Sequence, residues 1–340
     1  MFCTRYRVTT SADSGDDGRI YGTWDFKWPQ RTTIRVAFQE WRSEHASDTE
    51  LEAIKFNPRD RTEASLLGGE KGYGRLTRIV ECLARRWLAR LPSIDFKFEH
   101  GHHIPARPRD PGAQACPSRD SAADTYDVLV SLAPLPAEQR REELVNGAIT
   151  TLLKKYFLPG SELGRYAQRV DYGVPTTYLG KREHLAGSAA EYFGSPEFRH
   201  WVVHEFGHVL GLPHEQQNPN INKLIKLKDT DELVRILQAA LGYPPEAQQD
   251  ITRAEVEEEI VQSWPSLPGA PYCDFREYGP NDPFDDTTSI MFHLFWERLL
   301  VGGDEKAPPR HYEGPRDRDL EAVGQMYPNH AGASVVHMVG

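Results

Sequence analysis

HEFGHVLGLPH, at positions 204–214, is the stretch of this sequence that decides the fold. On a helix, His204 and His208 lie one turn apart on the same face, so both imidazoles can reach one ion. Glu205 is rotated off that pair, where a carboxylate can take a proton from a water molecule. The pattern H-E-x-x-H therefore predicts a metal-binding helix that carries its own general base.

The second half of the stretch turns the chain back toward the first two histidines. Gly211 can adopt the left-handed backbone that ends a helix, and Pro213 cannot continue one. His214 can then return as a third ligand. Three nitrogens and one open position are typical of a catalytic zinc site, whereas structural zinc sites are usually closed and rich in cysteine. We predict one catalytic Zn²⁺ on His204, His208 and His214, and disfavour a helix with merely solvated histidines.

The extended motif resembles the metzincin clan of zinc endopeptidases, whose second mark is a downstream Met-turn. The run SIMFH at 289–293 supplies Met291, which the resemblance places beneath the metal as an apolar floor. Within the clan the chain is most similar to the astacin family, because Glu215 follows the third histidine. Astacins carry a tyrosine two residues after the methionine, where this chain has His293. His293 is therefore the candidate for steadying the oxyanion; Tyr278 is an alternative donor, for which simple packing is favoured.

The resemblance implies an α+β fold in two lobes. The upper lobe is expected to hold a twisted mixed sheet, a backing helix and the active-site helix. The lower lobe is expected to be largely irregular and to end in a C-terminal helix at Asp319–Pro328. A substrate-binding edge strand is implied by the run PTTYLG at 175–180. Its predicted members are Thr176, Thr177, Tyr178, Leu179 and Gly180.

Periodicity in the rest of the chain supplies elements for such a fold. Apolar positions between Leu76 and Leu91 repeat at helical spacing and predict the backing helix. Alternation predicts strands at Thr33–Phe38 and Ile94–Phe98, and the apolar run Asp127–Leu132 predicts a buried central strand. The active-site helix is expected at 197–210.

The chain is expected to form one catalytic domain over residues 25–330. Residues 1–24 are predicted to be a flexible N-terminal segment or a short prosegment, and residues 331–340 a tail. Helical stretches at about 137–157 and 221–263 exceed what the compact clan core needs, so we interpret them as insertions.

A second cluster of histidines stands at the start of a proline-rich stretch, 101–121. His100, His102 and His103 are able to bind a second metal. No fixed partner spacing accompanies them, so a solvated loop is the favoured interpretation.

Composition limits the classes of partner. The net charge is −10 and the pI about 5.7, which argues against a general nucleic-acid or anionic-membrane surface. No apolar run reaches membrane-spanning length, and the first residues lack the apolar core of a secretory signal. The sequence as written thus favours a cytoplasmic protein, whereas the family is mostly secreted, and the compartment and oligomeric state stay open. The cysteines are widely spaced and predict no disulfide: Cys3, Cys82, Cys116 and Cys273.

The function predicted from these patterns is zinc-dependent hydrolysis of internal peptide bonds in a polypeptide substrate, with Glu205 as the general base. One rival is a catalytically weak or inactive zinc protein of the same fold that binds peptides or proteins. The loss of the family tyrosine favours this rival, and the intact Glu205 argues against it. A second rival is a zinc hydrolase of small amides, against which an extended strand beside the cleft argues.

Overall fold

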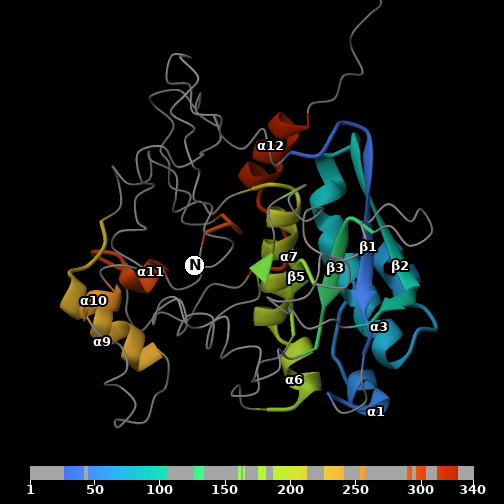
Figure 1. The fold of residues 1–340 in the computed structure, drawn as a ribbon, viewed down its shortest axis with the longest axis horizontal. Helices are drawn as coiled ribbons and strands as arrows, with labels where there is room; N and C mark the ends of the chain where they lie inside the picture. The colour runs from blue at the N-terminus through green and yellow to red at the C-terminus, as the bar shows by residue number, and fades with distance from the viewer. Residues whose placement is uncertain are drawn as a thin grey trace, which may run out of the picture.

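The computed structural model describes residues 27–41, 45–105, 126–133, 160–161, 164, 175–180, 187–212, 226–240, 253–256, 289–292, 296–303 and 312–327. Within them the architecture is α+β, with a mixed sheet and helices packed against it (Figure 1). This agrees with the predicted fold class. The predicted N-terminal segment, the stretch 137–157 and the tail lie outside the described residues.

The sheet has the strand order β2-β1-β3-β5-β4. These strands are β1 (Thr32–Gln39), β2 (Ile94–Ile104), β3 (Val128–Ser131), β4 (Gly160–Ser161) and β5 (Thr177–Tyr178). β1 runs parallel to β2 and β3, β3 runs parallel to β5, and β4 pairs antiparallel with β5. The three strands predicted from alternation and apolar runs are therefore confirmed.

β2 is longer than its sequence pattern suggested. The strand continues to Ile104, so positions 101–104 are not the start of a loop as predicted. The pairing of β1 with β2 shifts register between Ala37 and Phe38, which breaks the alternation that a regular strand would show. The His100 ring stacks on Phe38 with centroids 5.5 Å apart, which places it on the protein side of the strand rather than in solvent.

The predicted edge strand is not at the edge. β5 lies between β3 and β4, so its backbone is engaged on both sides. The amide of Thr176 donates to the carbonyl of Leu129 at 2.9 Å, and the amide of Leu179 donates to that of Ser131 at 2.8 Å. On its other side, β5 pairs with β4 at Thr177 and Tyr178, so these two residues of the predicted edge run 176–180 are not at the edge, and β4 takes that position beside them. A strand of two residues has too short a pattern to be found from the sequence.

Two long helices lie side by side against the sheet, α3 (Gly72–Arg85) and α7 (Pro196–Val209). α3 confirms the predicted backing helix, although it begins earlier and continues as a 3₁₀ turn, η2 (Arg86–Arg90). α7 confirms the helix expected at 197–210. It begins where the Ser195 hydroxyl accepts the amide of Phe198 at 3.0 Å.

Shorter helices complete the packing around this pair. α1 (Asp48–Glu52) and α6 (Ala189–Phe193) lie together, and the Glu50 carboxylate accepts the amide of Ala189 at 2.7 Å. α2 (Arg61–Leu67) packs on α3. α12 (Asp317–Met326) packs on η2, near the end of α7 in Figure 1.

A second group of helices lies on the far side of α7 from the sheet (Figure 1). It consists of α9 (Thr230–Ala240), α10 (Arg253–Val256) and α11 (Trp296–Leu299). Two of them fall in the stretch 221–263 that was predicted to be helical. An isolated antiparallel bridge pairs Leu227, which precedes α9, with Leu300, which directly follows α11.

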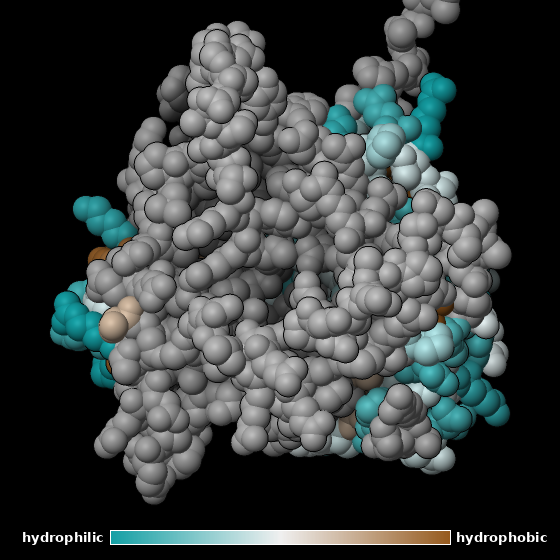
Figure 2. All heavy atoms as spheres, viewed as in Figure 1, coloured by the Kyte–Doolittle hydropathy of each residue, from teal (hydrophilic) through white to brown (hydrophobic). Residues whose placement is uncertain are grey.

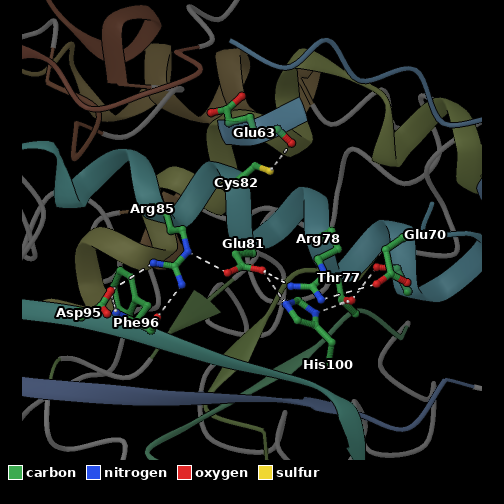
Figure 3. A network of polar contacts seen from close by, with 11 residues as sticks. Glu63, Glu70, Thr77, Arg78, Glu81, Cys82, Arg85, Asp95, Phe96 and His100 are labelled. Atoms are coloured by element: carbon green, nitrogen blue, oxygen red, sulfur yellow. Dashed lines mark hydrogen bonds and ion pairs between the residues drawn. The ribbon is translucent and has the colours of Figure 1, made fainter. Parts of the chain in front are cut away.

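A polar network connects α3 to β2 (Figure 3). Glu81 is only 3% exposed. Its carboxylate accepts hydrogen bonds from Arg78 at 2.9 Å and from Arg85 at 2.8 Å. The His100 ring lies between Glu81 Oε2 at 2.7 Å and Thr77 Oγ1 at 2.9 Å. His100 is thereby committed to this network, which argues against the second metal site considered from the sequence.

The described surface facing the viewer in Figure 2 is largely hydrophilic. Among the described residues, Val301 is the large hydrophobic side chain that is exposed, at 65%. Within the same residues, no helix combines the length and apolar character needed to cross a membrane. Cys82 is a buried free thiol, as its place in the apolar pattern of α3 predicted.

Candidate functional site

Helix α7 is buried over most of its length and carries polar side chains into the interior. His204 is 1% exposed, and Glu205 and His208 are both 0% exposed. Burying such groups costs free energy unless hydrogen bonds or ligands compensate for the lost water. The three predicted functional side chains of α7 are thus kept together away from bulk solvent.

The two histidines face each other through their ε nitrogens. His204 Nε2 and His208 Nε2 are 3.1 Å apart, and the ring planes are inclined at 85°. On the other side of each ring, Nδ1 contacts a backbone carbonyl. His204 Nδ1 lies 2.8 Å from the carbonyl oxygen of Ile290. His208 Nδ1 lies 2.6 Å from the carbonyl oxygen of Leu212. A carbonyl oxygen only accepts, so each Nδ1 carries the hydrogen, and both Nε2 lone pairs point at one place.

Burial keeps this pair neutral. It lowers the pKa of His204 to about 4, although the Ile290 carbonyl acts in the opposite direction. Burial also lowers the pKa of His208 well below its usual value, and a charge on His204 would lower it further. The hydrogen bond to the Leu212 carbonyl acts in the opposite direction and raises this pKa. Neutral imidazole is the form that ligates a metal ion, so the pair is in its ligating form at neutral pH.

The donor set fits zinc. Two nitrogens bound at about 2.0–2.1 Å to one tetrahedral Zn²⁺ lie about 3.3 Å apart, close to the 3.1 Å between His204 and His208. Backbone carbonyls that hold the outer ring nitrogens are the usual supports of metal-ligating histidines. Among the residues that the structure describes, no group of three His, Cys, Asp or Glu side chains gathers to hold a metal ion. The predicted third ligand, His214, lies outside the described residues, as do His293 and Tyr278.

Met291 lies against α7 at Gly207, which stands between His204 and His208 in the sequence. A Cβ added to Gly207 would come within 2.3 Å of the Met291 Sδ and 2.9 Å of Trp87 Cζ2. Gly207 therefore allows both side chains to approach the helix backbone. The carbonyl that orients His204 belongs to Ile290, so the turn containing Met291 contacts the site twice.

Asp319 of α12 holds that turn in place. Its carboxylate accepts the Ser289 hydroxyl at 2.5 Å and the Ile290 amide at 3.1 Å, and it also accepts the Arg316 amide at 2.7 Å. The chain of contacts runs from α12 through Ile290 to the His204 ring. The sequence placed Asp319 in the expected C-terminal helix but did not indicate this role, because an acidic residue in the first turn of a helix is common for dipole reasons alone.

His200 extends the row of histidines on α7 by one turn. The residue is 0% exposed, and its Nδ1 accepts the amide of Tyr312 at 3.1 Å. Its ring centroid is 6.0 Å from that of His204. The signal in the sequence that could have identified His200 is its spacing of four residues before His204.

The strand that borders α7 is β4 rather than the predicted run 176–180. β4 lies against α7, whereas Thr176 and Thr177 are buried inside the sheet at 1% and 0% exposure. The Ser161 and Thr177 hydroxyls are 2.8 Å apart across the pair. The buried positions of Thr176 and Thr177 therefore support the sheet from within.

No protein-family model matches the sequence, and no curated protein matches it. Solved structures of myroilysin are similar to this chain in fold. One shares 17% identity, with a TM-score of 0.46, over 91% of this chain and 98% of its own. A crystal structure of myroilysin shares 18% identity, with a TM-score of 0.41, over 91% of this chain and 89% of its own.

Proposed function

We propose that this protein is a zinc-dependent endopeptidase of the metzincin type, most similar to astacins. The observation that carries the proposal is the pair of neutral histidines whose ε nitrogens are 3.1 Å apart while carbonyls hold their outer nitrogens. Two facing lone pairs in a buried place repel each other unless a cation lies between them. The residues proposed to hold the metal are His204, His208 and His214.

When bound, zinc polarises the scissile carbonyl and lowers the pKa of a water molecule at the site. The protein residues hold and orient the reactants around it. Burial of His204 and His208 excludes bulk water and strengthens electrostatic interactions in the site. The carbonyls of Ile290 and Leu212 keep both rings in the tautomer that presents Nε2.

Glu205 is proposed to move the proton. It follows His204 directly on α7 and is fully buried with it. A carboxylate there takes a proton from the attacking water and returns it to the leaving amine. His293 is proposed to donate to the developing oxyanion in place of the family tyrosine.

A polypeptide substrate is proposed to pair with β4 rather than with the run 176–180. β4 closes the sheet beside α7, and within the described residues no strand pairs with its outer side. An extended peptide added at that edge would be held by backbone hydrogen bonds, which are independent of its side chains.

The rival function is a zinc-binding protein of the same type that recognises peptides without cleaving them. The observation in its favour is His293, which replaces the tyrosine that the resemblance leads one to expect. Both functions use the same ligands, so only turnover separates them.

The test is cleavage of denatured casein by the full chain of known zinc content, beside Glu205→Gln and a chelator control. We expect Glu205→Gln to keep zinc and lose at least about a hundredfold in rate, because the base is removed. Glu197→Gln is the matched control, since Glu197 is an exposed carboxylate on the same helix. Undiminished cleavage by Glu205→Gln would reject this role, and stoichiometric zinc without any cleavage would favour the peptide-binding rival.

A further inference from the structure

At the C-terminal end of α7, counting the C-cap residue Leu210, two of the last four carbonyls accept hydrogen bonds from the backbone that follows. The amide of Gly211 donates to His208 O at 2.8 Å, and the amide of Leu212 donates to Gly207 O at 3.0 Å. Gly211 has φ of +97°, a left-handed conformation that glycine adopts without strain. This pair of bonds is the Schellman arrangement of a helix end.

The other two carbonyls are satisfied by side chains from opposite ends of the described chain. The indole Nε1 of Trp28 donates to Val209 O at 2.7 Å, and the hydroxyl of Tyr327 donates to Leu210 O at 2.7 Å. The Tyr327 hydroxyl also accepts the backbone amide of Trp28 at 3.2 Å. Trp28 and Tyr327 are each 1% exposed, so water does not compete for these bonds.

This helix end is connected directly to a metal-ligand side chain. Leu212, the last residue of the Schellman turn, supplies the carbonyl that accepts from His208 Nδ1 at 2.6 Å. The orientation of the His208 ring thus depends on where the turn places Leu212. The same turn leads into Pro213 and His214 in the sequence, so its position also sets the start of the segment that carries the third proposed ligand.

We propose that Trp28 and Tyr327 are positioning residues for the metal centre. By fixing the carbonyls of Val209 and Leu210, they hold the turn that orients His208. This inference rests on the proposed zinc site. It goes further by assigning the geometry of one ligand to two side chains that lie 299 residues apart in the sequence.

The experiment measures zinc affinity of the full chain by competition with a chromophoric chelator. Tyr327→Phe removes one hydroxyl and leaves the ring in place. We expect it to weaken zinc binding about tenfold, as loss of a supporting hydrogen bond around metal ligands does. Trp28→Phe should weaken it similarly. The Co²⁺-loaded forms of both variants should show shifted visible absorption, because the ligand geometry changes.

The matched control is Tyr73→Phe. The Tyr73 hydroxyl also donates to a backbone carbonyl, that of Gln39 at 2.8 Å, and Tyr73 is also buried. It therefore measures the cost of losing a buried hydroxyl away from α7. We expect it to lower thermal stability while leaving zinc affinity and the Co²⁺ spectrum unchanged.

The outcomes separate this inference from the proposed function. Equal zinc affinity in the parent, Tyr327→Phe and Tyr73→Phe would overturn the positioning role while leaving the zinc site intact. A parent protein that binds no zinc would overturn both. Weakened binding in Tyr327→Phe and Trp28→Phe, with unchanged binding in Tyr73→Phe, would support the inference.

Discussion

Helices α3 and α7 are neighbours of equal length that bury polar side chains in opposite ways. Each has 14 residues, and they pack against one another. α3 buries the carboxylate of Glu81, and α7 buries the imidazoles of His204 and His208. The difference lies in the partners that each helix supplies.

On α3, charge is matched by opposite charge (Figure 3). Burial alone would raise the pKa of Glu81. Hydrogen bonds from His100, Arg85 and Arg78, together with the charge of Arg85, more than offset burial and bring the pKa to about 2. Glu81 is thus ionised across the ordinary pH range, and the network ties α3 to β2.

On α7, the imidazoles are left neutral and their outer nitrogens are tied to backbone carbonyls. The inner nitrogens of the two rings face each other at 3.1 Å. The buried polar groups of α3 stabilise the fold, whereas the buried imidazoles of α7 are the groups that we propose to bind a cation.

The largest effect is expected at α7 itself. His204→Ala removes one of the proposed ligands, and we expect zinc affinity to fall by about a thousandfold or more, about 4 kcal/mol. Chelator competition on the purified protein measures this. His103→Ala removes an exposed histidine of β2 and should leave the affinity unchanged. If His204→Ala still held stoichiometric zinc tightly, His204 would not be a ligand, and the proposed difference between α7 and α3 would be contradicted.

The corresponding change on α3 should affect stability and not metal binding. Glu81→Gln leaves two arginines facing a neutral side chain, and we expect a loss of about 3 kcal/mol in the free energy of unfolding. Since the folded pKa of about 2 lies below the ordinary glutamate value of 4.5, Glu81 stabilises the fold above pH 4.5. That contribution is lost as the pH falls toward 2.

Denaturant unfolding between pH 2 and 7 tests this. The parent should lose stability through the acid range, and Glu81→Gln should lose less over the same range. Glu70→Gln is the matched control, because Glu70 is 41% exposed and 3.5 Å from Arg78. It should change stability by less than about 1 kcal/mol. An equal loss of unfolding free energy in Glu81→Gln and Glu70→Gln would show that the buried carboxylate of α3 stabilises the fold no more than the exposed one.

A smaller effect is expected where α7 contacts the turn at Met291. Gly207→Ala would place a methyl group within 2.3 Å of the Met291 Sδ, and we expect about 2 kcal/mol of destabilisation with weakened zinc binding. Gly324→Ala on α12 is the control, because a Cβ there meets nothing within 4 Å. That variant should be neutral or more stable by about 0.5–1 kcal/mol. Matching behaviour of the two variants would show that the approach at Gly207 is not tight.

The smallest effect is expected at Asp319, which is one step removed from the histidines. Asp319→Asn keeps the size of the side chain but removes acceptor capacity for Ser289 or Ile290. We expect zinc affinity to fall about tenfold, about 1.4 kcal/mol. Asp317→Asn, on the same helix but with its side chain 87% exposed, should have no effect on zinc. The link from α12 to His204 would be rejected if both variants bound zinc as the parent does.

Much of the framework was predictable because it follows from local periodicity. The apolar spacing before Leu91 identified α3, and alternation identified β1 and the first part of β2. β5 was expected as a strand only through the resemblance at 176–180, and β4 was not predicted, since two-residue strands form only when their neighbours are in place. The edge assignment failed for this reason: which strand lies outermost depends on pairing across the sheet, and no single segment contains that information.

The sequence by itself determined the chemistry of the candidate site. The spacing of His204, Glu205 and His208 requires only a helix to bring these side chains onto neighbouring positions, and the helix is a local structure. Only the tertiary structure decided how those side chains are held. The carbonyl of Ile290, the carboxylate of Asp319, and the donors on Trp28 and Tyr327 come from distant segments. Their positions depend on packing, because hydrogen bonds between remote groups form only after the core has brought them together.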